Sequence, residues 1–194
     1  MRRAAILLAT FLILPPSAAS AGQVLCRNEA DDIAALQMFD RAVNAYVEMT
    51  RRVEVPLSPW IASDLEAMAA ANDALARAIA AERPDARQGD IFGPEVADFF
   101  RVRIDASGAL KGRQYTLARC GEEAEDAPCV RPPLVHSRLA WMWSAPIGDA
   151  LARALPPLPL ELQYRLSPDG SVLLLVDVRA ALVIDLMDVA PASS

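Results

Sequence analysis

The sequence predicts an α+β fold in which antiparallel helices pack on a small C-terminal antiparallel β-meander. Apolar residues recur at helical spacing through the N-terminal half of the chain. Residues 162–187 have the pattern of three consecutive strands, and the middle one, 172–176, is apolar at every position. Because strand side chains alternate between the two faces of a sheet, such a strand needs cover on both sides. We expect the rest of the chain to provide that cover.

The first residues indicate export. Two arginines precede an apolar run at 4–14, and an Ala-Ser-Ala sequence at 19–21 offers a cleavage site. This is the pattern of a secretory signal peptide, and its apolar core is too short to span a bilayer. We therefore expect residues 1–21 to be a signal peptide and residues 22–194 to form one periplasmic or secreted domain without a transmembrane segment.

The charge balance argues against two classes of partner. Without the two arginines of the signal peptide, 17 basic and 25 acidic residues remain, which gives a net charge of −8. A chain this acidic, with no basic cluster, is not expected to bind nucleic acid or an anionic membrane surface.

Four helices are predicted before the strands. The first covers about 28–52, where apolar residues recur every three or four positions. The second starts with a capping box formed by Ser63 and Glu66 and stops before Pro84. Pro94 opens the third at its favoured first position, and Gly108 ends it. The loop between the second and third helices is short, which predicts that these two pack antiparallel. A short fourth helix at 147–155 leads to the strands.

The connection before the third helix is the most distinctive irregular stretch, and its residues 87–93 are RQGDIFG. An alanine-rich helix precedes it, a helix-opening proline follows it, and a later LPPLP sequence at 155–159 precedes the strands. In these features the chain resembles a group of uncharacterised exported bacterial proteins, over most of its mature length. The resemblance implies no activity.

Three cysteines are present in a chain expected to reach an oxidising compartment. Cys120 and Cys129 flank a short acidic loop, so a disulfide between them is the expected arrangement. Cys26 is then left over. It would be free, pair between chains, or pair with one of the other two.

The sole histidine, His136, is a candidate general base or metal ligand. A zinc site made of Cys120, Cys129 and His136 would have a spacing unlike that of compact zinc modules, and it would compete with the disulfide. Neither a Gly-x-Ser-x-Gly elbow nor a glycine-rich phosphate loop is present. We therefore expect no metal and no cofactor, and we favour a structural or exposed histidine.

Two further groups of residues have a functional and a structural interpretation. Asp177 and Asp185 lie on neighbouring predicted strands and would do acid–base work if they faced each other across a cleft. The favoured alternative is that each marks a strand end or pairs with an arginine such as Arg179. Arg87, Asp90 and Glu95 would line a small polar pocket, or Asp90 would bond to nearby backbone within an architectural loop.

Trp141 and Trp143 are two residues apart, so an extended backbone points both rings the same way. They would stack on a sugar or a peptide, or they would cover the second face of the middle strand. The second interpretation is favoured because that face needs cover. A homodimer formed through the same sheet is the remaining alternative.

Together these observations predict an exported, non-enzymatic module that binds a protein or small-molecule partner. The alternative is a small hydrolase that uses His136 or the Asp177 and Asp185 pair. An exposed apolar groove would favour the module, whereas convergence of those three side chains in one pocket would favour the hydrolase.

Overall fold

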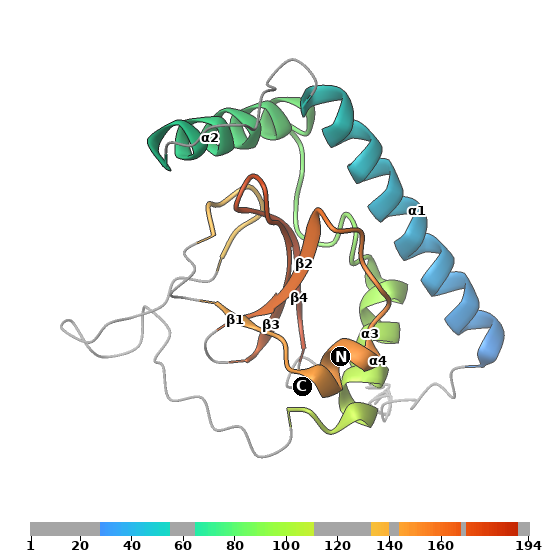
Figure 1. Cartoon of the computed structure of the whole chain (residues 1–194). Helices are drawn as coiled ribbons and strands as arrows, with labels where there is room; N and C mark the ends of the chain where they lie inside the picture. Colours follow the sequence, from blue (N-terminus) through green and yellow to red (C-terminus); the bar gives the residue numbers. More distant parts are fainter. Residues whose placement is uncertain (1–27, 55–64, 111–132, 140–143, 168–169, 190–194) are drawn as a thin grey trace, which may run out of the picture.

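The computed structural model describes residues 28–54, 65–110, 133–139, 144–167 and 170–189, and these form four helices and one four-stranded sheet (Figure 1). The helices are α1 (Glu29–Glu54), α2 (Leu65–Glu82), α3 (Pro94–Ser107) and α4 (Asp149–Ala154). The strands are β1 (Ala145–Pro146), β2 (Leu162–Leu166), β3 (Val172–Asp177) and β4 (Leu182–Asp188). The predicted α+β class is confirmed. No helix in these ranges is long and apolar enough to cross a membrane.

The sheet has the strand order β1-β2-β3-β4, and every neighbouring pair is antiparallel. The last three strands are the predicted meander. Gly170 ends the β2–β3 turn with a φ of 64°, the left-handed conformation that favours glycine at this position. The two-residue strand β1 was not predicted, because its Ala-Pro sequence carries no strand pattern.

The helix boundaries follow from local chemistry. At the start of α1, the side chain of Asn28 accepts a hydrogen bond from the N–H of Asp31 at 2.9 Å, which satisfies one free donor of the first turn. α3 begins at Pro94, and Gly108 closes it with a φ of 63°, as predicted. The predicted cap of α2 at Ser63 lies outside the described residues.

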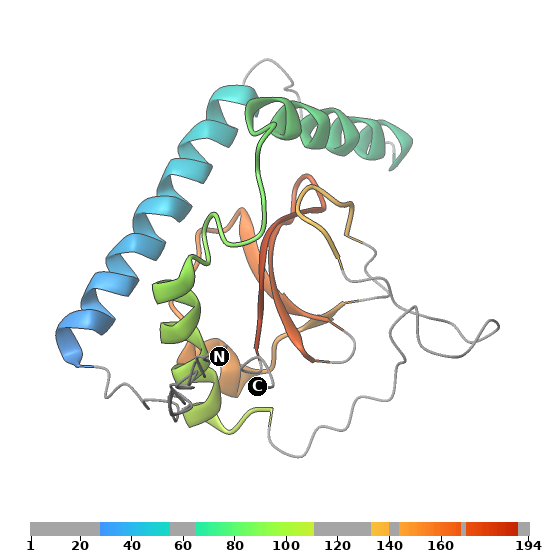
Figure 2. The ribbon, with the colours of Figure 1, turned by 180° about the vertical axis from the view of Figure 1, so that it is seen from behind.

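α1 contacts both α2 and α3, which lie toward opposite ends of it (Figures 1 and 2). α3 runs alongside the N-terminal half of α1 in the opposite direction, so the antiparallel helix pair of this fold is α1 with α3. The expected antiparallel pairing of α2 with α3 was wrong. The connecting residues 83–93 run past strand β4 and bond to it, which carries α3 away from α2.

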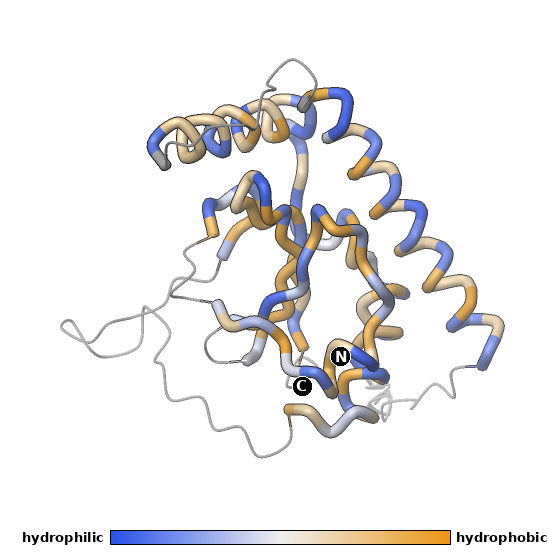
Figure 3. The backbone as a smooth tube through the Cα atoms, viewed as in Figure 1, coloured by the Kyte–Doolittle hydropathy of each residue, from blue (hydrophilic) through white to orange (hydrophobic). Residues whose placement is uncertain are grey.

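The sheet is covered on both faces, as the apolar middle strand requires. One face packs on the helices through a core that includes Phe39, Phe100, Leu173 and Leu175. Figure 3 shows the apolar residues gathered on the strands, whereas α1 alternates polar and apolar residues along its length. On the second face, Leu174 and Val176 are 1% and 0% exposed.

Residues 134–139 form part of the cover of that second face, and we call this segment the strap. Val135 and Leu139 of the strap pack against a second apolar cluster made of Val172, Leu174, Val176, Val183 and Leu186. Trp141 and Trp143, which the sequence assigns to the same face, lie outside the described residues.

Strand β4 contains a bulge that reorients its side chains. Leu175 pairs with Asp185 and Val176 pairs with Val183, so Ile184 is an extra residue on the β4 side. Ile184 belongs to the helix-side core, while Val183 and Leu186 belong to the core of the second face. Since residues paired across strands share a face, Asp185 points with Leu175 toward the helices. The bulge therefore places a carboxylate under the connection between α2 and α3.

Candidate functional site

Asp185 is fully buried and is enclosed by backbone donors. Its Oδ1 accepts hydrogen bonds from the N–H groups of Gly89 and Leu186, both at 2.8 Å. Its Oδ2 accepts from Ile91 at 2.7 Å and from Phe92 at 2.6 Å. Burial raises the pKa of the Asp185 carboxyl, and the four backbone donors oppose that rise. Every donor is part of the main chain, so this carboxylate fastens one segment to another.

The conformation of Gly89 makes this arrangement feasible. Its φ of 89° is one that side-chain-bearing residues rarely adopt, and it lets the N–H groups of Gly89, Ile91 and Phe92 converge on one carboxylate. Such a concave group of N–H donors normally holds an external anion. Here Asp185 of the same chain fills it.

Asp177 is also fully buried, and a different set of partners holds it. It accepts a hydrogen bond from the Tyr46 hydroxyl at 3.1 Å and one from the Arg179 guanidinium at 3.1 Å. The N–H groups of Arg179 and Ala180 add bonds of 3.0 and 3.2 Å. The guanidinium also donates to the Thr50 hydroxyl at 3.2 Å. Burial, reinforced by the Asp177 charge, raises the pKa of Tyr46 above its usual range.

Asp177 and Asp185 therefore do not face each other across a cleft. Asp177 pairs in the sheet with Leu162 and Leu182, whereas Asp185 pairs with Leu175. Asp177 pairs with Arg179, as the structural interpretation predicts, and neither carboxylate is exposed to solvent. They act as two separate anchors between the sheet and the elements above it.

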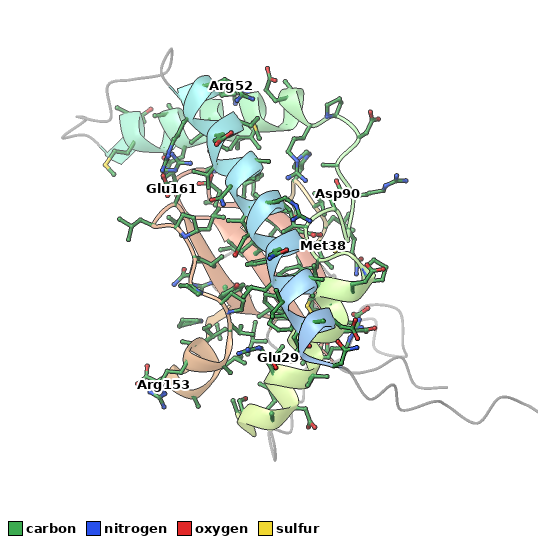
Figure 4. All side chains as sticks on the ribbon, turned by 90° about the vertical axis from the view of Figure 1, so that its right-hand side faces the viewer. Glu29, Met38, Arg52, Asp90, Arg153 and Glu161 are labelled. Atoms are coloured by element: carbon green, nitrogen blue, oxygen red, sulfur yellow. The ribbon has the colours of Figure 1, made fainter. Side chains whose placement is uncertain are left out.

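Asp90 is bonded within its own loop, and the Arg87 side chain extends into solvent. The Asp90 carboxylate accepts the Arg87 N–H at 3.1 Å and the Arg83 guanidinium at 3.4 Å. The Arg87 side chain is 86% exposed. Ile91 and Phe92 are buried in the helix-side core. These placements match the architectural interpretation of the loop. In Figure 4, Asp90 lies on one side of α1 and Glu161 on the other.

His136 lies in the strap at the outer edge of β4. Its N–H donates to the Val183 carbonyl at 2.8 Å, while Arg83 donates to the next carbonyl, that of Ile184, at 3.3 Å. The backbone of His136 has a φ of 64°, and no partner for its enclosed Nε2 is found among the described residues. Burial lowers the pKa of His136, the Arg83 charge lowers it further, and the Asp90 charge opposes both.

Trp141, Trp143 and the three cysteines, Cys26, Cys120 and Cys129, lie outside the described residues. Within the described ranges, no group of three His, Cys, Asp or Glu side chains is arranged to hold a metal ion.

An apolar groove of about 250 Å³ lies between β1, α4 and the start of β2. The residues that line it are Pro146, Ile147, Ala152, Pro156, Pro157, Leu158, Leu162, Gln163 and Tyr164. The Tyr164 hydroxyl donates to the Pro156 carbonyl at 3.1 Å, so the proline segment is fixed to the sheet. Sequence reasoning missed this groove. Its signal in the sequence is LPPLP at 155–159, which supplies Pro156, Pro157 and Leu158 of the lining.

Comparison of the chain with protein-family models, with curated proteins and with solved structures finds no match. The described residues include two buried carboxylates, a histidine with a positive φ at a sheet edge and a groove beside α4.

Proposed function

We propose that this protein is an exported, non-enzymatic binding module that holds an apolar segment of a protein partner in the groove between α4 and β2. The groove carries the proposal. Its walls are prolines and aliphatic side chains, and its polar groups are the Gln163 amide and the Tyr164 hydroxyl. The Tyr164 hydroxyl already bonds to Pro156, and the surface that remains for a ligand is more apolar than polar.

The size of the groove favours a protein segment over a cofactor or metabolite. Ligand pockets that enclose a small molecule usually measure about 300–1,000 Å³. A groove of about 250 Å³ accommodates one or two apolar side chains instead. Three prolines in its walls restrict backbone motion, so little conformational entropy is lost when a partner docks.

The polar residues support a non-enzymatic role. Asp177 and Asp185 are both fully buried, and their oxygens are occupied by the protein's own donors. A hydrolase built on this pair would need a carboxylate within reach of a substrate. The hydrolase alternative therefore lacks an observation comparable to the groove.

A matched pair of variants tests the proposal. Ala152 and Ala150 are both exposed on α4, but only Ala152 lines the groove. Peptides from a random phage-displayed library would be selected on the wild-type protein, and their affinities for both variants measured by fluorescence anisotropy. We expect apolar-rich peptides that bind A152R at least about tenfold more weakly, because a buried contact of about 1.4 kcal/mol is lost. A150R should bind them as the wild type does.

Two outcomes would overturn the proposal. One is selection of peptides that bind A152R and A150R equally well. The other is a library that yields no binder to the wild-type protein. Circular dichroism of both variants confirms that an altered affinity does not come from unfolding.

A further inference from the structure

The strap pairs with β4 as a short additional strand. The His136 N–H donates to the Val183 carbonyl at 2.8 Å, and the Val183 N–H donates to the Ser137 carbonyl at 3.0 Å. The Leu139 N–H donates to the Ala181 carbonyl at 2.8 Å. An unpaired strand edge would present these groups to other chains. The strap therefore closes the first half of the β4 edge.

Side chains close the second half of that edge. Arg83 donates to the Ile184 carbonyl at 3.3 Å, and Arg101 donates to the Asp188 carbonyl at 3.0 Å. The Asp185 carboxylate accepts the Leu186 N–H. Along the described part of β4, the strap is therefore the segment whose main chain pairs with the strand edge. If the strap leaves, the edge at Val183 and the apolar residues beneath Val135 and Leu139 lose their cover.

His136 is an unusual residue for its place in the strap. A φ of 64° is uncommon for residues other than glycine, although histidine and asparagine adopt it more often than most side chains do. Its Nε2 is enclosed and has no hydrogen-bond partner among the described residues, although buried polar atoms are normally paired. An uncommon backbone conformation that coincides with an unpaired titratable nitrogen points to a role beyond packing.

The surrounding charges favour the neutral ring. Arg83, at the end of α2, and Asp90, in the following loop, are the charged groups that act on His136, and the Arg83 effect is the larger. Arg138 of the strap is engaged elsewhere: it forms an ion pair with Asp73 at 2.7 Å and donates to the Ala180 carbonyl. A proton on Nε2 would place a second cation beside Arg83 without an acceptor to receive it.

We propose that His136 makes the strap an acid-sensitive edge strand, which closes β4 when the ring is neutral and detaches when the ring is protonated. This inference does not rest on the groove, which lies at the opposite edge of the sheet.

The direction of the pH dependence follows from the lowered pKa. A released strap leaves His136 with an ordinary pKa of about 6.5, whereas the closed strap holds the pKa below that value. The released form therefore binds protons first as the solution becomes more acidic. Closure of the strap is fully favoured above about pH 6.5 and weakens as the pH falls below that value.

Amide hydrogen exchange measured by NMR tests whether the strap detaches from β4 in acid. Between about pH 8 and about pH 5, the protection of the Leu139 and Val183 amides should fall several-fold after correction for intrinsic exchange rates. The Leu175 amide, in the centre of the sheet, should keep its protection. Because the chain has one histidine, its ring-proton signals report the titration of His136 without ambiguity.

His136→Asn is the control variant, because asparagine tolerates a positive φ and does not titrate in this range. We expect its strap amides to keep a constant protection from about pH 8 to about pH 5. The same fall in His136→Asn as in the wild type would overturn the proposal. So would a wild-type strap whose protection does not follow the ring-proton titration, a measurement that needs no variant.

Discussion

The orientation of the Asp185 carboxylate depends on the bulge at Ile184, the residue before it. Without the bulge at Ile184, the alternation of β4 would turn the carboxylate toward the second face of the sheet. With the bulge, both carboxylate oxygens meet main-chain donors of the 89–92 segment. The sequence showed an aspartate within an apolar strand and a distinctive RQGDIFG stretch, but nothing local in either segment indicates that they meet. That contact depends on a one-residue irregularity of pairing.

Replacing Asp185 with asparagine should destabilise the fold strongly. An amide has one acceptor oxygen and turns an NH₂ group toward N–H donors, so about two buried donors lose their acceptor. We expect the free energy of unfolding to fall by about 3 kcal/mol or more. Urea denaturation measures this loss. Asp188→Asn alters an exposed carboxylate on the same strand and should change stability by less than about 0.5 kcal/mol. Equal stabilities for the two variants would contradict the assigned role of Asp185.

The elements that the sequence predicted well are those with a local signature. The spacing of apolar residues marks α1, α3 carries a proline at its start and a glycine at its end, and the alternation in β2 marks a strand. How the elements pack was harder to predict, because packing depends on contacts distant in sequence. α2 and α3 were expected to pair through their short connection, but that connection is bonded to β4.

The attachment of α1 to the sheet can be measured with two tyrosines. Tyr46 and Tyr164 are both buried, and each donates one hydrogen bond of 3.1 Å, the first to a carboxylate and the second to a carbonyl. Bonds to charged groups contribute about 1.5–3 kcal/mol and bonds to neutral groups about 0.5–1.5 kcal/mol. Thermal or urea unfolding should therefore show that Tyr46→Phe costs more than Tyr164→Phe. The reverse order would mean that Asp177 does not depend on α1.

For the molecule as a whole, the central observation is a sheet buried on both faces. The apolar sequence of β3 predicted this, and the exposures of Leu173, Leu174 and Leu175 confirm it. The apolar run could not specify what supplies the cover. Helices cover one face, and the strap contributes to the other. The site was less predictable than the fold, because the groove forms where three separate elements meet.

Burial on both faces makes a quantitative prediction. Leu175→Ala, on the helix side, and Leu174→Ala, on the strap side, should each lower the free energy of unfolding by about 2–5 kcal/mol, the usual cost of a cavity in a core. Val102→Ala removes a side chain that is 54% exposed on α3 and should cost less than about 1 kcal/mol. Chemical denaturation distinguishes these values. A Leu174→Ala variant that behaves like Val102→Ala would place the second face in water.

The hydrogen bonds from the 89–92 amides to Asp185 also bear on the order of folding. The three bonds join residues 93 to 96 positions apart, and the bond from Tyr46 to Asp177 spans 131. Closing loops this long costs chain entropy before any contact compensates for it, so topologies of this kind assemble slowly. We expect the helices to form early as local segments and to acquire their final position only after the last strand docks. The native state is therefore expected to be complete only after the C-terminal strand β4 has formed.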